Sequence, residues 1–265
     1  MTQPTTPQPD EIDEIDDHPT PAKVWDEMRR GNARFINGVP RHPRQDVEHR
    51  HQLAKSQRPR AALFGCSDSR LAAEIIFDKG LGDLFVVRNA GQVISESALG
   101  SLEYAVAVLD VSVVVVLAHD ECGAVRAAID SVGPHAKPLP VHIQGLIDVI
   151  IPSVRRVAAV AAARSGSIPT VSEIDGEAVG QEHLRDTVTA LLLQSEIISD
   201  AVAAGTLAIV GANYRLADGL AQADRGRGQR RQCRPGSGGV GDVGKRLAAC
   251  ASVAPGHQRG RGACV

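Results

Sequence analysis

Three short apolar segments, each followed by a polar loop and then by a segment with helical spacing, constrain the fold of this chain most strongly. The apolar segments are residues 60–66, 84–87 and 111–118, and the helical segments that follow them are 70–79, 97–109 and 123–129. Continuous Val-rich strands that alternate with helices are typical of a parallel sheet covered on both faces. The sequence therefore predicts an α/β fold with a central, mostly parallel β-sheet flanked by helices.

Helical spacing also occurs outside these units. Four apolar residues predict a surface helix over residues 21–37, interrupted at Gly31: Val24, Trp25, Met28 and Phe35. We also expect helices over residues 143–163 and 181–204 and a last strand over 206–214.

Charge and hydropathy argue against two classes of protein. The formal net charge is −2 and the most apolar run is residues 111–118, whereas a membrane-spanning helix needs about 20 residues. We expect no membrane association, and the balanced charge makes nucleic acid an unlikely partner. The N-terminus lacks the basic and apolar regions of a signal peptide, so we expect a cytoplasmic protein.

Soft metal ligands follow two of the predicted strands. Cys66 and Asp68 follow the first strand, and His119 and Cys122 follow the Val-rich strand. Ligands gather at the carboxyl ends of parallel strands, so these side chains are expected to converge. Two cysteines and one histidine, with a fourth position open or filled by oxygen, are typical of a catalytic zinc site. The alternative interpretation is ordinary buried cysteines and a loop-capping histidine.

The motifs around these residues resemble those of the β-class carbonic anhydrases. They are CSDSR at 66–70, RNAG at 88–91, SLEYA at 101–105 and HDECG at 119–123. A Trp followed by Gly-Asn-x-Arg-Phe, at 25–35, resembles the N-terminal helix of that family. The resemblance implies a β-carbonic anhydrase-like fold. It also implies zinc-dependent, reversible hydration of carbon dioxide to bicarbonate and a proton by attack of zinc-bound hydroxide.

The resemblance also implies roles for single residues. One Zn²⁺ per subunit is bound by Cys66, His119 and Cys122, with Asp68 either as the fourth ligand or paired with Arg70. When paired, Asp68 stays ionised and accepts a hydrogen bond from the nucleophile, so Asp68 and Arg70 are the expected catalytic residues. A helix cap and a surface ion pair are the alternative roles of these two residues. The backbone N–H of Gly123 is expected to face bicarbonate.

Some positions depart from the family pattern or stay undecided. Leu63 replaces the Trp of a second, inhibitory bicarbonate site, so we expect that site to be absent or weak. Arg88 and Tyr104 are then expected to be structural, with Tyr104 on a helix face turned to the core. Any exposed histidine is a candidate proton shuttle, and the sequence does not choose among His18, His42, His49, His51, His135, His142, His183 and His257.

Assembly and rival functions follow from the same resemblance. It implies a homodimer or homotetramer, with the helix around Trp25 packed on a neighbour. One alternative function is hydrolysis of CS₂ or COS at the same zinc site, and another is non-catalytic zinc binding. A thiol oxidoreductase using Cys66 and Cys122 is disfavoured because they do not form a Cys-x-x-Cys pair.

The two ends of the chain differ from its middle in charge. Residues 1–18 carry six acidic residues and no Lys or Arg, and residues 220–265 carry nine basic residues against two acidic ones. We expect a disordered acidic segment over 1–20, a β-carbonic anhydrase-like catalytic domain over 21–219 and an atypical basic Gly/Arg/Ala-rich tail over 220–265.

That tail lacks the return strand which the resemblance implies. Its origin stays open between a reading frame shifted near Leu220, a natural extension that binds a polyanion, and an inert tail. Three cysteines in this stretch have no metal-ligand spacing and are not counted as ligands: Cys233, Cys250 and Cys264.

Overall fold

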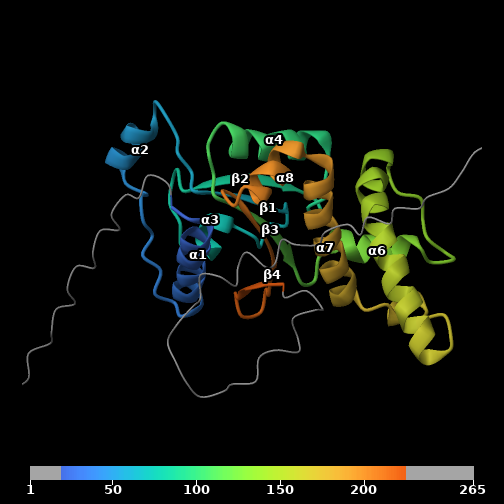
Figure 1. Cartoon of the computed structure of the whole chain (residues 1–265). Coiled ribbons are helices and arrows are strands. Elements are labelled where there is room, and N and C mark those ends of the chain that lie inside the picture. The colour runs from blue at the N-terminus through green and yellow to red at the C-terminus, as the bar shows by residue number, and fades with distance from the viewer. Residues whose placement is uncertain (1–18, 225–265) are drawn as a thin grey trace, which may run out of the picture.

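The computed structural model describes residues 19–224, which form one five-stranded sheet with helices on both faces (Figure 1). Four strands are parallel and the short last strand is antiparallel, in the spatial order β2-β1-β3-β4-β5. This confirms the predicted α/β class. The strands are β1 (Ala61–Cys66), β2 (Leu84–Asn89), β3 (Val113–His119), β4 (Ala208–Tyr214) and β5 (Ala221–Ala223).

The central strand β3 is apolar almost throughout because helices cover both of its faces. All seven of its residues are buried. Val113, Val115 and Leu117 contact one hydrophobic cluster. The alternate residues, Val114 and Val116, contact a second cluster on the opposite face. Successive side chains of a strand point to opposite faces, so neither face tolerates a polar residue here.

The helices divide between these two clusters. On the first face lie α1 (Pro21–Ile36), α3 (Ala73–Ile76), α5 (Gly123–Ser131) and α6 (Val141–Ser165). On the second face, α4 (Glu96–Ala107) and α8 (Glu196–Ala203) lie together over the strands (Figure 1). The helix α7 (Gly176–Gln194) supplies residues to both clusters. The short elements α2 (Val47–Leu53) and η1 (Val171–Glu173) bury no residue.

The strand order creates a topological switch point at the carboxyl ends of β1 and β3. The chain leaves β1 toward β2 on one side, and β3 pairs with the other side of β1. Loops that leave two neighbouring parallel strands in opposite directions open a crevice between them, where ligands of such sheets bind. Cys66 ends β1 and His119 ends β3, so both residues stand at this switch point.

The Gly-Asn-x-Arg-Phe motif fastens α1 to the rest of the domain. The prediction that Gly31 interrupts this helix is wrong, because α1 continues through it to Ile36. A Cβ on Gly31 would stand 1.8 Å from the carbonyl oxygen of Phe77. The absence of a side chain at Gly31 therefore permits a close approach of α1 to the chain after α3. The helix continues through this residue in spite of the glycine.

Asn32 is the central residue of this fastening. Its side chain is buried, and its Nδ2 donates hydrogen bonds to the carbonyl oxygens of Ile76, at 3.1 Å, and Gly219, at 2.8 Å. Its Oδ1 accepts a hydrogen bond from the backbone N–H of Ala221 at 2.9 Å. One side chain thus joins α1, α3 and the turn between β4 and β5, and it satisfies three buried backbone groups.

The aromatic residue of α1 also packs inside its own chain. Trp25 is 8% exposed and meets Phe77 edge to face, with ring centroids 6.3 Å apart. Contacts inside the chain therefore explain the apolar stripe of α1. The expected packing of this helix on a neighbouring subunit is not needed for that. Arg34 forms an ion pair with the buried carboxylate of Asp78 at 2.5 Å, which adds a charged contact to the same interface.

Two further predictions need correction. The helix expected over residues 181–204 is two helices, because Ser195 is extended and its Oγ caps α8 by accepting a hydrogen bond from Ile198 N–H. The return strand expected to be missing after Gly219 begins as β5, which pairs with β4.

The terminal predictions concern parts of the chain outside the described residues. These are the acidic segment up to residue 18 and the tail from residue 225, with its three cysteines. Within residues 19–224, no helix has the length and apolar character needed to cross a membrane.

Replacing Asn32 by Ala is expected to lower the free energy of unfolding by about 2–4 kcal/mol, because buried polar groups left without partners cost about 1–3 kcal/mol each. Urea denaturation measures the change. The matched control is Asn37→Ala, since Asn37 ends the same helix and its amide makes one exposed hydrogen bond to the Ala33 carbonyl. We expect the control to change stability by less than about 0.5 kcal/mol. Equal losses in the two variants would contradict the role assigned to Asn32.

Candidate metal centre

Three buried side chains with soft ligand atoms meet at the carboxyl ends of β1 and β3. Cys66 ends β1, His119 ends β3 and Cys122 precedes α5. One ligand atom from each, the two sulfurs and a ring nitrogen, all lie within 4.8 Å of one another. They are 5%, 3% and 7% exposed respectively. The structure thus brings together the three residues named as ligands from the sequence.

The ring of His119 is held with a free lone pair toward the two sulfurs. Its Nδ1 lies 2.7 Å from the carbonyl oxygen of Asp120. A carbonyl oxygen only accepts, so Nδ1 carries a proton, and the imidazole lone pair that can bind a metal is the one on Nε2. That Nε2 is buried and has no hydrogen-bond partner among the described residues. A buried polar atom without a partner is costly, and a metal ion is the partner that fits it.

Of the two neighbouring thiols, one loses its proton easily and the other does not. A hydrogen bond from the neighbouring Cys122 lowers the pKa of the Cys66 thiol. The hydrogen bond to Cys66, together with burial, raises the pKa of Cys122. A second thiolate beside the first therefore needs a cation. Two sulfurs and one imidazole nitrogen are a donor set that suits zinc, with a fourth position left for a small ligand.

Asp68 lies beside this group and is paired with Arg70. Asp68 Oδ1 accepts hydrogen bonds from the Arg70 backbone N–H and Nε, both at 2.9 Å, and Oδ2 accepts one from Nη2 at 2.7 Å. The Arg70 side chain holds the pKa of Asp68 well below its usual range. Asp68 Oδ2 stands 4.0 Å from His119 Nε2. Of the two expected arrangements, the structure has the arginine pair.

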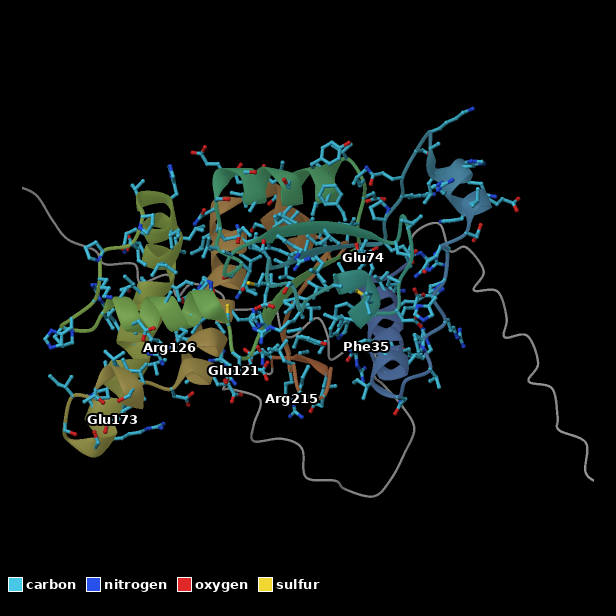
Figure 2. All side chains as sticks on the ribbon, turned by 180° about the vertical axis from the view of Figure 1, so that it is seen from behind. Phe35, Glu74, Glu121, Arg126, Glu173 and Arg215 are labelled. Carbon is cyan, nitrogen blue, oxygen red and sulfur yellow. The ribbon has the colours of Figure 1, made fainter. Side chains whose placement is uncertain are left out.

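Two arginines tie the loops of the site together through backbone carbonyls. Arg70 Nη2 also donates to the carbonyl oxygen of Glu121, at 3.1 Å, and so joins the loop after β1 to the loop after β3. Arg88, on β2, donates to the carbonyl oxygens of Cys66 and Asp68, at 2.9 and 2.6 Å. The loop after β3 also contacts the end of β4, where the Asp120 N–H donates a hydrogen bond to the Tyr214 carbonyl oxygen at 3.2 Å. Figure 2 labels Glu121 and Arg215, which belong to these two segments. Arg88 was predicted to be structural, and its two hydrogen bonds join β2 to the loop after β1.

The remaining predicted residues fall in different places. Gly123 begins α5 directly after Cys122, and a Cβ there would have no neighbour within 4 Å. Leu63 is buried. The prediction that Tyr104 faces the core is wrong, because this side chain is 46% exposed. Its ring packs against Phe85 at the sheet edge, with centroids 6.1 Å apart.

The histidines proposed as proton shuttles differ in exposure. His183 is 1% exposed, so it is not a surface group. His49 is partly buried and its Nε2 lies 3.1 Å from the Leu81 carbonyl oxygen. His18 and His257 lie outside the described residues, and the exposed ones are His42, His51, His135 and His142.

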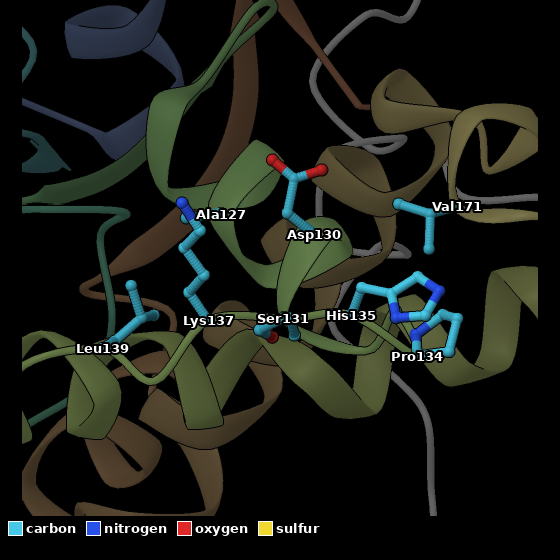
Figure 3. A pocket seen from close by; sticks show the side chains of 10 residues that line it. Ala127, Asp130, Ser131, Pro134, His135, Lys137, Leu139 and Val171 are labelled. Carbon is cyan, nitrogen blue, oxygen red and sulfur yellow. The ribbon is translucent and has the colours of Figure 1, made fainter.

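A separate cavity of about 530 Å³ lies where α5 ends (Figure 3). Its lining includes Asp130, His135, Lys137 and Val171, and none of Cys66, His119 and Cys122. Asp130 is neutralised by Arg126 on the same helix. The cavity is therefore distinct from the metal centre.

Comparison with known proteins identifies relatives over most of the described residues. A profile of the carbonic anhydrase family matches residues 61–221. Carbonic anhydrase 2 of Mycobacterium tuberculosis is 46% identical over 201 residues, which cover 76% of this chain and 91% of that protein. A carbonic anhydrase of Mycolicibacterium smegmatis is 44% identical over 199 residues, with coverage of 75% and 91%.

Solved structures give the same result for the fold. A β-carbonic anhydrase of Aspergillus fumigatus matches with a TM-score of 0.56 and 26% identity, over 76% of this chain and 89% of that chain. A tetrameric β-carbonic anhydrase of Sordaria macrospora matches with a TM-score of 0.55 and 22% identity, over 76% and 94%. The chain therefore belongs to the carbonic anhydrase family, as a bacterial β-class member.

Proposed function

We propose that this protein catalyses the reversible hydration of carbon dioxide to bicarbonate and a proton at the centre formed by Cys66, His119 and Cys122. The observation that carries the proposal is the buried His119 Nε2, which lacks a hydrogen-bond partner and faces two thiols. We assign one Zn²⁺ per subunit to these three side chains. Zinc bound there lowers the pKa of a water from 15.7 to about 7–9, which supplies a nucleophile near neutral pH.

Asp68 is proposed to orient the nucleophile. Its carboxylate is ionised and fixed on two sides by Arg70. An ionised carboxylate only accepts hydrogen bonds. Asp68 therefore accepts the hydrogen of the attacking group, which turns a lone pair of that group toward the carbon atom of the substrate. Arg70 acts by keeping Asp68 ionised and away from the fourth position.

Gly123 is proposed to bind the product. Its N–H is one of the first-turn donors of α5, which have no partner within the helix. The N-terminal end of a helix carries partial positive charge, and this favours an anion such as bicarbonate. The open space beside the Gly123 Cα leaves room for that anion.

The assembly and location are also proposals. A homodimer or homotetramer is consistent with the printed description of the Sordaria macrospora relative as tetrameric. The cytoplasm is the proposed location, and sedimentation of the purified full chain together with cell fractionation tests both.

Replacing Cys122 by Ser is expected to weaken zinc binding by more than about 100-fold, because changes in groups that only support metal ligands already cost 10–100-fold. Competition with a chromogenic chelator measures the affinity, and elemental analysis of the wild type is expected to give one zinc per chain. The matched control is Cys233→Ser, a cysteine to which the sequence gives no ligand spacing. Unchanged affinity in the Cys122 variant would rule out the proposed ligand set.

Replacing Asp68 by Asn is expected to lower kcat for CO₂ hydration by about 100-fold, the scale of one positioned proton-accepting group, with zinc content unchanged. Stopped-flow assays between pH 6.5 and 9 measure this change. Because the pKa of Asp68 lies well below its usual range, its ionisation is complete throughout this interval. The pH dependence in this interval therefore comes from the zinc-activated water and not from Asp68. Activity is expected to rise with pH in both proteins.

The matched control for this experiment is Asp26→Asn on α1. Asp26 is also paired with arginine, but on the exposed face of the helix. The control is expected to keep wild-type kcat. Full activity in Asp68→Asn would show that Asp68 is only part of an ion pair.

A further inference from the structure

A buried histidine on α7 reaches the turn that contacts Cys66. His183 is 1% exposed, and its Nε2 lies 2.8 Å from the carbonyl oxygen of Gly91. The N–H of Gly91 in turn donates a hydrogen bond to Cys66 Sγ at 3.3 Å. One residue of the turn thus links the histidine to a proposed metal ligand.

The state of the His183 ring follows from its partner. A carbonyl oxygen only accepts, so the proton is on Nε2. Nδ1 is buried and has no hydrogen-bond partner among the described residues. Burial lowers the pKa of His183, so the ring is neutral, and its Nε2–H donates a hydrogen bond to the Gly91 carbonyl oxygen.

The turn is strained and closely packed. Gly91 has φ +81° and Gln92 has φ +41°, so two successive residues are left-handed. Gln92 is not a glycine and is 1% exposed, and such a conformation persists only where surrounding contacts hold it. A Cβ on Gly91 would lie 2.9 Å from Ala124 Cβ and 3.0 Å from Ile150 Cδ1. The turn therefore cannot shift toward α5 or α6.

Contacts from α7 hold this turn from outside. Besides the His183 contact, Thr187 Oγ1 lies 3.4 Å from the Gln92 carbonyl oxygen and 2.9 Å from the His183 carbonyl oxygen. Within the turn, Asn89 bonds the backbone N–H and carbonyl of Val93. These internal bonds close the turn, and the contacts from α7 fix its two carbonyl groups against the sheet.

We propose, on the basis of the metal site proposed above, that His183 is a positioning residue that keeps the Gly91 N–H on Cys66 Sγ. A hydrogen bond to a thiolate withdraws charge from the sulfur, so it changes how strongly that sulfur donates to a metal ion. The contact of His183 with the Gly91 carbonyl thus sets the donor strength of Cys66. His183 touches neither the substrate nor the metal ion and acts only through this turn.

The test uses the full chain loaded with Co²⁺, whose charge-transfer absorption from thiolate reports the sulfur ligands directly. His183→Leu removes the donor to the Gly91 carbonyl and places an apolar side chain in the buried position. We expect it to shift the thiolate-to-cobalt band and to weaken Co²⁺ and Zn²⁺ binding by about 10-fold. His183→Gln places an amide N–H near the position of Nε2, and we expect it to restore both properties.

The matched control removes a different, partly buried hydrogen bond to α7. Ser153 on α6 is fully buried and its Oγ donates to Asp186 at 2.6 Å. Ser153→Ala is expected to lower stability while the cobalt spectrum and affinities stay at wild-type values. Circular dichroism checks that each variant folds. If His183→Leu does not fold, His183→Asn takes its place, because its amide is too short to reach the Gly91 carbonyl.

Three results are decisive. No thiolate band in the cobalt-loaded wild type would overturn the proposed metal site itself. A normal wild-type band that is unchanged in His183→Leu, or in its Asn substitute, would overturn the inference and leave the metal site intact. The same spectral shift in Ser153→Ala would also overturn it, because any loosening of α7 would then suffice.

Discussion

The parallel pairing of β1 with β3 is the constraint on which the rest of this structure depends. Their register pairs Ala61 with Val113 and continues to Gly65 and Leu117, so the two strands reach the same edge of the sheet together. Cys66 and His119 are the last residues of these strands. Strand backbones in a covered sheet are rigid, so the separation of Cys66 and His119 is set by backbone hydrogen bonds.

Two arginines extend this rigidity into the loops. Both Arg70 and Arg88 donate to backbone carbonyls of residues in the ligand-bearing loops, at Glu121 and at Cys66 and Asp68. A guanidinium presents several donors in a fixed plane, so it orders two chain segments at once. The carboxylate of Asp68 is thus positioned by the same side chain, Arg70, that keeps it charged.

Patterns local in sequence predicted the strands and the ligand-bearing loops well, because burial on both faces demands continuous apolar residues and ligand motifs are short. Features that depend on distant contacts were missed. The helix break expected at Gly31 is a close approach to Phe77, and Tyr104 lies on the exposed side of α4. His183 contacts a residue 92 positions away. No local period in the sequence contains that information. Whether Asp68 pairs with Arg70 or occupies a metal site likewise depends on side-chain geometry, which the sequence does not give.

The Asn32 contacts also bear on when the domain is completed during synthesis. This side chain, near the start of the described chain, bonds backbone groups 187 and 189 residues later. A ribosome releases the chain from its N-terminus at about 5–20 residues per second, so α1 leaves the exit tunnel many seconds before its partners do. During that interval Asn32 has only the α3 side of its final surroundings. Closure of the domain therefore waits until β5 has been synthesised.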